Sequence, residues 1–381
     1  MKVLAFSDTH LGAQRYNLVW FKDALKHAFI SALEIAADNN VDLVIFTGDL
    51  FDTPFVEPSD ILFALQAFKK FNFNIIAITG NHDIRSDKPY ETSPVALLEE
   101  SYPKMKVLTN TNPCYHYNDV NFIGIPYITP IQFIEYRKHT SMLERYYKYI
   151  DTKYVNIALL HQDLSILDYA KHMWHTALNL SDIEPFDFSI IGHYHNKVEH
   201  KKFLYPGSTY PLSFKQSHVA KGVYLLNIDN NSISYEFIPI KPLKSLKEIH
   251  VTYPFDETYV FQESNADVVK LVVTVEEKVL QEAISFVRNN IRPVLSKQLD
   301  KFIVDFDIQE SYTKENVEYN TTFDIESFSQ LANIADYDNL KHFDVKTVKK
   351  LLHEVENFVS PYKSMDKRIS QAINILQRVV G

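Results

Sequence analysis

The sequence predicts an α/β fold, followed by a smaller α+β unit and a helical C-terminal tail. Three observations point to this architecture. Apolar runs of strand length alternate with amphipathic stretches over residues 1–245. Hydrophobic residues make up 46% and charged residues 23% of the 381 residues, a composition that excludes wholesale disorder, collagen and coiled-coil rods. The third observation is that Asp, Asn and His directly follow several of the apolar runs.

The alternating region predicts strands and helices in turn. Strands are expected over Lys2–Phe6, Leu43–Phe46, Ile75–Ile78, Phe122–Ile125, Ile157–Leu160 and Phe188–Ile191. Helices are expected over Trp20–Asn39, Pro58–Phe71 and Pro94–Tyr102, where apolar residues recur at helical spacing. After His193 the pattern changes to short strands, and the segment Asp229-Asn230-Asn231 favours a turn. Antiparallel sheet is therefore expected over Lys202–Tyr205, Gly222–Ile228 and Ser232–Ile238.

The pattern changes again near Lys241–Lys247, which predicts domains over 1–245, 246–311 and 312–381. The second domain is expected to be a β-β-α-β unit, built from His250–Tyr253, Val268–Val275, Glu276–Asn290 and Phe302–Phe306. The third is polar and helical, with helices expected over Val345–Val359 and Lys367–Val380. The apolar stripe of Val345–Val359 is typical of core packing, but little else surrounds it, so we favour a helix that binds a partner.

Charge and cysteine content indicate the cellular compartment of the protein and the kinds of partner that it can bind. The net charge of −9 argues against binding nucleic acid by bulk charge alone, although local basic patches and metal cations remain compatible with it. No stretch reaches the roughly 20 apolar residues of a membrane span, and the apolar N-terminal run is too short for a signal peptide. Cys114 is the single cysteine, so no internal disulfide can form. We expect a cytoplasmic protein with no membrane partner.

Five polar fragments directly follow predicted strands. They are Asp8-Thr9-His10, Gly48-Asp49-Leu50-Phe51-Asp52, Gly80-Asn81-His82-Asp83, Leu160-His161-Gln162 and Gly192-His193-Tyr194-His195. Loops at one edge of an α/β sheet converge in space, so these side chains are expected to meet. A mixed nitrogen and oxygen site without thiolates suits Mn, Fe, Zn or Mg ions rather than a structural zinc.

The number of candidate ligands predicts two ions. Seven residues are too many for one octahedral ion with an open position: Asp8, His10, Asp49, Asn81, His161, His193 and His195. Asp49 is the expected bridge, because a carboxylate offers two oxygens, and it would hold the ions ~3.5–4 Å apart, as in two-metal phosphoester hydrolysis. His82 would protonate the leaving oxygen or stabilise the transition state. The competing interpretation, surface turns and core histidines, requires all five fragments to coincide by chance.

The ordered series of motifs resembles that of the calcineurin-like metallophosphoesterase superfamily and, more narrowly, the SbcD/Mre-eleven nuclease family of double-strand-break repair. The narrower resemblance rests on SDTHLG at Ser7–Gly12, GDLFD at Gly48–Asp52, GNHD, GHYH and YPGST at Tyr205–Thr209. The length and the segment Tyr253–Phe255 are also similar to phage members. The resemblance implies a sandwich of two packed sheets flanked by helices, a capping domain that binds DNA at 246–311, and a tail at 312–381 that binds an ATPase.

Carried onto this chain, the resemblance assigns one metal to Asp8, His10, Asp49 and His195. The other metal would be bound by Asp49, Asn81, His161 and His193, and His82 would be the catalytic histidine. Position 52 is Asp, as in many bacterial and phage-like members, where archaeal and eukaryotic members have a second catalytic histidine. Asp52 is therefore a candidate either for catalysis or for bracing the loop. After GST the chain has Tyr210-Pro211, where many members have Glu-Arg, so a DNA contact there is not carried over.

The implied reaction is Mn²⁺-dependent hydrolysis of DNA phosphodiesters, with Mg²⁺ as the other candidate ion. The resemblance implies a 3′-to-5′ exonuclease and single-strand endonuclease that processes DNA ends in repair, recombination or replication. The implied partners are DNA, an SbcC/Rad-fifty-type ATPase and a second copy of this chain. The alternative is another calcineurin-like enzyme that hydrolyses small phosphodiesters.

Two weaker patterns leave alternatives open. His172 and His175 have i, i+3 spacing, and a helix edge is favoured over a third metal site. Between residues 136 and 154, Arg and Lys interleave with Tyr. This segment is either a phosphate-contacting face with stacking rings or a solvated helix whose tyrosines pack on the core.

Overall fold

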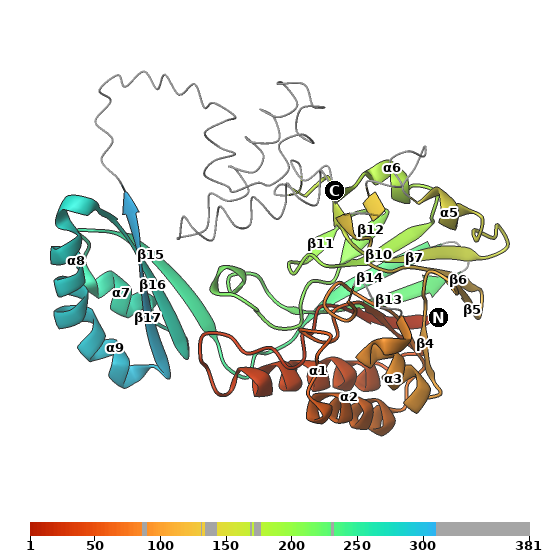
Figure 1. Cartoon of the computed structure of the whole chain (residues 1–381), viewed down its shortest axis with the longest axis horizontal. Helices are drawn as coiled ribbons and strands as arrows, with labels where there is room; N and C mark the ends of the chain where they lie inside the picture. Colours follow the sequence, from red (N-terminus) through yellow and green to blue (C-terminus); the bar gives the residue numbers. More distant parts are fainter. Residues whose placement is uncertain are drawn as a thin grey trace, which may run out of the picture. The chain divides into compact units, whose positions relative to one another are not determined.

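The computed structural model confirms the predicted α/β sandwich, in which two sheets pack face to face and helices cover their outer sides (Figure 1). The structure describes residues 1–85, 90–130, 132–133, 143–167, 170, 177–229 and 232–309. His172, His175, Tyr136, Arg137, Lys138 and the tail helices over Val345–Val359 and Lys367–Val380 lie outside the described residues. Among the described helices, none combines the length and the apolar character that a membrane span requires.

The first sheet has the strand order β14-β13-β1-β2-β3-β4. Its strands are β1 (Lys2–Phe6), β2 (Leu43–Thr47), β3 (Ile75–Ile78), β4 (Met105–Val107), β13 (Gly222–Asp229) and β14 (Ser232–Pro239). Strands β1 to β4 run parallel, whereas β13 pairs antiparallel with both β1 and β14. Parallel strands need crossover connections, and the helices between them supply these connections.

The second sheet has the strand order β11-β12-β10-β7-β6-β5. Its strands are β5 (Cys114–Tyr117), β6 (Val120–Ile125), β7 (Val155–His161), β10 (Phe188–Gly192), β11 (Val198–Glu199) and β12 (Phe203–Tyr205). Strand β12 pairs parallel with β10, so the prediction that Lys202–Tyr205 forms antiparallel sheet was wrong for this pairing. The antiparallel prediction is confirmed for β13 and β14, which pair with each other. The short strands β8 (Asp163–Leu164) and β9 (Ala177–Leu178) form a separate pair.

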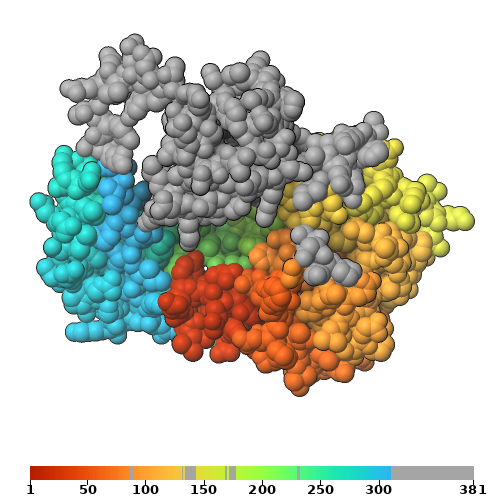
Figure 2. Space-filling model, in the orientation of Figure 1, coloured from red at the N-terminus to blue at the C-terminus, as the bar shows by residue number. Residues whose placement is uncertain are grey.

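Three apolar layers hold the sandwich together. Alternate residues of each strand, such as Ile45 and Leu159, point between the sheets and are fully buried there. The other face of the first sheet packs on α1 (Phe21–Asp38), α2 (Pro58–Phe71) and α3 (Pro94–Ser101), which lie side by side in Figure 1. In Figure 2 this N-terminal part of the chain forms the red-to-orange surface. The outer face of the second sheet packs on α5 (Glu144–Tyr147) and α6 (Leu180–Ile183).

Residues 246–309 form a three-stranded parallel sheet with an apolar core of its own. The order is β15 (Leu246–Thr252), α7 (Glu257–Glu263), β16 (Val268–Glu276), a run of helical turns that includes α8 (Leu280–Phe286) and α9 (Arg292–Gln298), and β17 (Lys301–Gln309). The predicted β-β-α-β order lacked α7. Since β15 and β16 run parallel, a crossover between them is required, and α7 provides it.

Candidate metal centre

The seven predicted ligands lie at the carboxyl ends of parallel strands from both sheets. From the first sheet come Asp8 and His10 after β1, Asp49 after β2 and Asn81 after β3. From the second sheet come His161, the last residue of β7, and His193 and His195 after β10. A continuous set of side-chain contacts links all seven. The sheet edge predicted from the strand ends is therefore where these groups meet, and their role as ligands stays a prediction.

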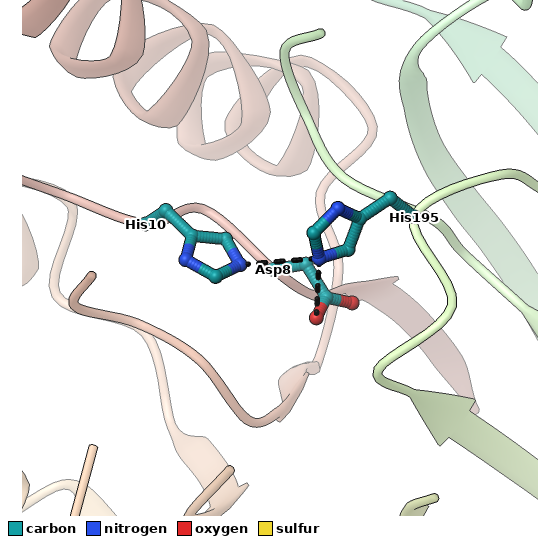
Figure 3. Close-up of side chains that lie close together, drawn as sticks. All are labelled: Asp8, His10 and His195. Carbon is teal, nitrogen blue, oxygen red and sulfur yellow. Dashed lines mark hydrogen bonds and ion pairs between the residues drawn. The ribbon is translucent and has the colours of Figure 1, made fainter. Parts of the chain in front are cut away.

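One group of candidate ligand atoms consists of Asp8, His10 and His195, shown in Figure 3. The Nε2 atoms of His10 and His195 lie 3.3 Å apart. Nε2 of His195 lies 3.8 Å from Oδ1 of Asp8. Nε2 of His10 also lies 3.6 Å from Oδ2 of Asp49. Contacts through His10 thus connect Asp8, His195 and Asp49, and these are the four residues that the motif resemblance assigns to one metal.

The second group consists of Asp49, His161 and His193, with Asn81 between the two histidines. Nε2 of His161 lies 3.3 Å from Oδ2 of Asp49 and 3.2 Å from Oδ1 of Asn81. The same Asn81 oxygen lies 3.0 Å from Nδ1 of His193. This group again matches the set assigned to the other metal.

These separations fit divalent cations. An ion with ligand bonds of about 2.0–2.2 Å holds adjacent ligand atoms about 3 Å apart, close to the distances within each group. Oδ2 of Asp49 lies close to a histidine of each group, 3.6 Å from Nε2 of His10 and 3.3 Å from Nε2 of His161. Imidazole, carboxylate and amide donors without a thiolate suit Mn, Fe, Zn or Mg. The residues present therefore fit a pair of divalent cations with Asp49 as the bridge.

The backbone at this edge adopts conformations that non-glycine residues rarely take. Asp8, His10, Asp49 and His193 have φ angles of 52°, 45°, 56° and 88°. Left-handed backbone is unfavourable for residues with a Cβ, and such residues cluster at functional sites. Backbone hydrogen bonds hold two of these loops together, from the amide of Asp8 to Gly48 O at 3.0 Å and from that of His10 to Asp49 O at 3.1 Å.

Gly48 allows the two sheets to approach closely at the centre. Its φ is +94°, and a Cβ there would overlap Nδ1 of His161 and lie 2.8 Å from the amide nitrogen of Gly80. Nδ1 of His161 lies 2.7 Å from the carbonyl oxygen of Thr47. That carbonyl fixes the ring so that Nε2 faces Asp49.

Asp52, a predicted catalytic candidate, lies behind His10. Its Oδ1 lies 3.1 Å from Nδ1 of His10 and accepts a hydrogen bond from Nη2 of Arg15 at 2.7 Å. The backbone oxygen of Asp52 lies 2.7 Å from Nδ1 of His82, whose ring stands edge-on to that of His10 at 4.9 Å between centroids. His10, Asp52 and His82 are thus close together, and this geometry favours bracing as the role of Asp52.

Asp83 and Gln216 also organise the centre, and neither was a predicted site residue. The buried Asp83 carboxylate accepts hydrogen bonds from the amides of Asp49 at 2.8 Å, Gly80 at 3.0 Å and Phe51 at 3.0 Å. Nε2 of Gln216 lies 3.0 Å from Nδ1 of His195. The place of Asp83 in GNHD was a usable signal, whereas no local pattern marks Gln216.

Burial and crowding shift the acid–base behaviour of the centre. Burial, together with the nearby Asp49, raises the pKa of the Asp8 carboxyl. Burial and Asp49 likewise raise the pKa of Asp83 to about 7. Burial opposes charge on His161, but Asp49 outweighs it and raises the pKa of His161 to about 9. Carboxylates crowded in a dry site are stabilised by positive charge, which divalent cations would provide.

The interleaved basic and aromatic segment packs on the second sheet where the structure describes it. Tyr146 is buried and Tyr147 and Tyr149 pack against the same apolar cluster. Arg145 donates to the hydroxyl of Tyr146 at 2.9 Å. These contacts agree with the core-packing interpretation. Tyr210, at the position where the YPGST motif departs from the family pattern, is also buried, with its hydroxyl bonded to Lys244 O at 2.6 Å.

One family model matches more than half of the chain. Residues 1–205 match the model of the calcineurin-like phosphoesterases. The protein TT1561 of Thermus thermophilus is 13% identical, with a TM-score of 0.40 over 62% of this chain and 98% of that one. Purple acid phosphatase PPD1 from yellow lupin (Lupinus luteus) seeds is 14% identical, with a TM-score of 0.37 over 62% of this chain and 51% of the other. Nuclease MPE of Pseudomonas putida is 14% identical, with a TM-score of 0.24 over 42% of this chain and 63% of the other.

Proposed function

Because the chain belongs to the calcineurin-like phosphoesterase family, we propose that this metal-dependent phosphoester hydrolase is a DNA nuclease. The proposed reaction is Mn²⁺-dependent hydrolysis of DNA phosphodiesters, as a 3′-to-5′ exonuclease and a single-strand endonuclease. The observation that carries the two-metal part is the position of Asp49 Oδ2, 3.6 Å from Nε2 of His10 and 3.3 Å from Nε2 of His161. The choice of DNA as substrate rests on the narrower motif resemblance to the SbcD/Mre-eleven family.

The side chains of the centre have different roles in such a hydrolysis. When bound, the two ions supply Lewis acidity and lower the pKa of water. His10, His161 and His195 would bind these ions through Nε2, and their Nδ1 atoms lie against Asp52, Thr47 O and Gln216, respectively, which orients the rings. His82 is turned by the Asp52 carbonyl at its Nδ1, so its Nε2 is the nitrogen that can pass a proton to the leaving oxygen.

The partners of the enzyme are part of the same proposal. We place it in a complex that processes DNA ends in repair, recombination or replication, with an SbcC/Rad-fifty-type ATPase bound to residues 312–381 and with two copies of this chain. Residues 246–311 would cap the DNA. Light scattering would report a mass about twice 44.3 kDa for the dimer, and a monomer would contradict it. Removal of residues 312–381 is expected to abolish ATPase binding and to leave hydrolysis of a short oligonucleotide in place.

A paired assay tests the substrate. The metal-free protein is reloaded with Mn²⁺ or Mg²⁺ and incubated with end-labelled single- and double-stranded DNA, beside bis(p-nitrophenyl) phosphate. We expect the 3′ strand to shorten with Mn²⁺ and His82→Ala to lose this activity. Hydrolysis of the small diester alone would favour the alternative, an enzyme that acts on small phosphodiesters.

A further inference from the structure

We propose that Phe55 and Arg85 form a subsite on which a base of the DNA strand stacks beside the metal centre. The proposal rests on the proposed nuclease function and adds to it the group that the enzyme holds next to the scissile phosphate. Two loops carry the pair. Phe55 follows Asp52 on the loop after β2, and Arg85 follows His82 and Asp83 on the loop after β3.

The two loops are joined to each other at the catalytic histidine. Nδ1 of His82 lies 2.7 Å from the backbone oxygen of Asp52. Phe55 comes three residues after this contact and Arg85 three residues after His82. Three residues of extended chain span at most about 11 Å, so the backbone of both residues lies within roughly that distance of this contact.

The exposure of Phe55 needs an explanation. Its side chain is 73% exposed, the most exposed aromatic side chain in the described part of the chain. Its backbone amide bonds Oγ1 of Thr53 at 3.2 Å, which fixes the turn that presents it. The guanidinium of Arg85 lies over the ring, 5.6 Å from its centroid. The ring thus contributes little to the core and is held in place by a cation.

An exposed aromatic ring paired with a guanidinium matches the chemistry of a single nucleic-acid strand. Bases stack on aromatic side chains regardless of sequence, and arginine adds attraction for both base and phosphate. The chain carries a net charge of −9, so contact with a polyanion depends on local cations. Arg85 places one such positive charge against the Phe55 ring.

The pair is tested by oligonucleotide binding and hydrolysis measured separately. Fluorescence anisotropy of a labelled single-stranded oligonucleotide in EDTA reports binding without catalysis. Phe55→Ala is expected to weaken binding, and kcat/KM on the oligonucleotide, by about fivefold or more. Phe55→Trp should preserve both, and Val19→Ala, which truncates another exposed apolar side chain, should change neither. Hydrolysis of bis(p-nitrophenyl) phosphate should stay as in the unmodified protein for Val19→Ala, which is not part of the proposed pair.

A second measurement separates stacking from a general effect on the loop. Oligonucleotides with one base removed in turn are compared on the unmodified protein and on Phe55→Ala. Removal of the base at one position should lower the affinity of the unmodified protein about fivefold. The same removal should not lower the affinity of Phe55→Ala any further. Unchanged binding and cleavage by Phe55→Ala would overturn the subsite while leaving the nuclease function intact. Loss of oligonucleotide binding without any DNA cleavage by the unmodified protein would contradict the nuclease function and leave the subsite standing.

Discussion

Oδ1 of Asp52 lies 3.1 Å from Nδ1 of His10, on the side of the ring opposite to Nε2, which faces the other candidate ligands. A carboxylate in this position fixes the orientation of a metal-binding imidazole and increases its basicity. Arg15 holds the same oxygen at 2.7 Å and keeps the carboxylate in place. Asp52 is therefore expected to act through His10.

Asp52→Asn tests this arrangement, because it keeps the size of the side chain and removes its charge. We expect the affinity for Mn²⁺ to fall about 10–100-fold. Hydrolysis should fall at limiting Mn²⁺ and recover in part at saturating Mn²⁺. Calorimetric titration of the metal-free protein measures the affinity. Unchanged affinity together with a lowered kcat would instead assign Asp52 a direct part in the reaction.

His82→Ala should separate catalysis from metal binding. His82 forms a third group of candidate ligand atoms with His10 and Asp52, but it belongs to neither of the two groups assigned to the metals, so the metal content is expected to stay the same. Loss of a group that transfers a proton is expected to lower kcat by about 10²–10⁴-fold. Elemental analysis beside the DNA assay checks both. A variant that also loses a metal would show that His82 is a ligand.

Substitutions of Asp49 and His193 are expected to differ in the number of metal sites that they affect. Asp49→Asn removes half of the proposed bridge and should lower the occupancy of both sites, because Oδ2 faces both groups. His193→Asn should affect one site only, since its side chain belongs to the group of Asp49 and His161 and not to that of Asp8, His10 and His195. Metal-to-protein ratios after dialysis distinguish the two variants. Equal ratios in both would contradict the bridging position of Asp49.

The chelated protein should lose stability as the pH rises. Burial and Asp49 raise the pKa of Asp83 from 3.8 to about 7, so the folded state binds more protons than the unfolded state between these values. The stabilisation is complete below the unfolded pKa and is lost as the pH passes the folded one. Urea unfolding in EDTA should show a fall on the order of a few kcal/mol between about pH 4 and 7. With Mn²⁺ the fall should be smaller, and a flat profile in EDTA would contradict the shift.

Gly48→Ala and Gly12→Ala form a matched pair. Both glycines have positive φ, +94° and +91°, so both variants strain the backbone by roughly 1 kcal/mol. Only at Gly48 does the new methyl group overlap His161, whereas at Gly12 its nearest neighbour is Oδ2 of Asp60 at 3.1 Å. Gly48→Ala should therefore lose more thermal stability and also lose metal. Similar losses in both variants would leave backbone strain as the whole cause.

Sequence patterns predicted much of the fold because apolar runs and strand-end polar residues are local signals. The runs at Leu43–Phe46 and Ile157–Leu160 coincide with β2 and β7 to within three residues at each end. The polar residues at the ends of these strands, such as Asp49 and His161, could be expected to lie close together, because parallel strands end at one edge of a sheet. Helix α7 was missed, since its seven residues carry too short a pattern to separate from a loop.

The supporting groups could not be predicted, because their contacts join distant segments. Gln216 meets His195 across 21 positions, and Arg15 meets Asp52 across 37. Neither lies in a strand-end motif, and only the folded chain brings them to their partners. The sequence does not decide how Tyr146 packs, because the segment around it suits both a nucleic-acid-stacking face and a helix that packs on the core.

The candidate ligands are divided between the two sheets, with Asp49 from one and His161 from the other. Cations held between them would crosslink the halves of the sandwich. Retention of metal would then report whether the halves remain in register, even after a change at a remote position such as Ile45 or Leu159. Truncations in that interior are expected to release metal at temperatures where circular dichroism still reports intact helices and strands.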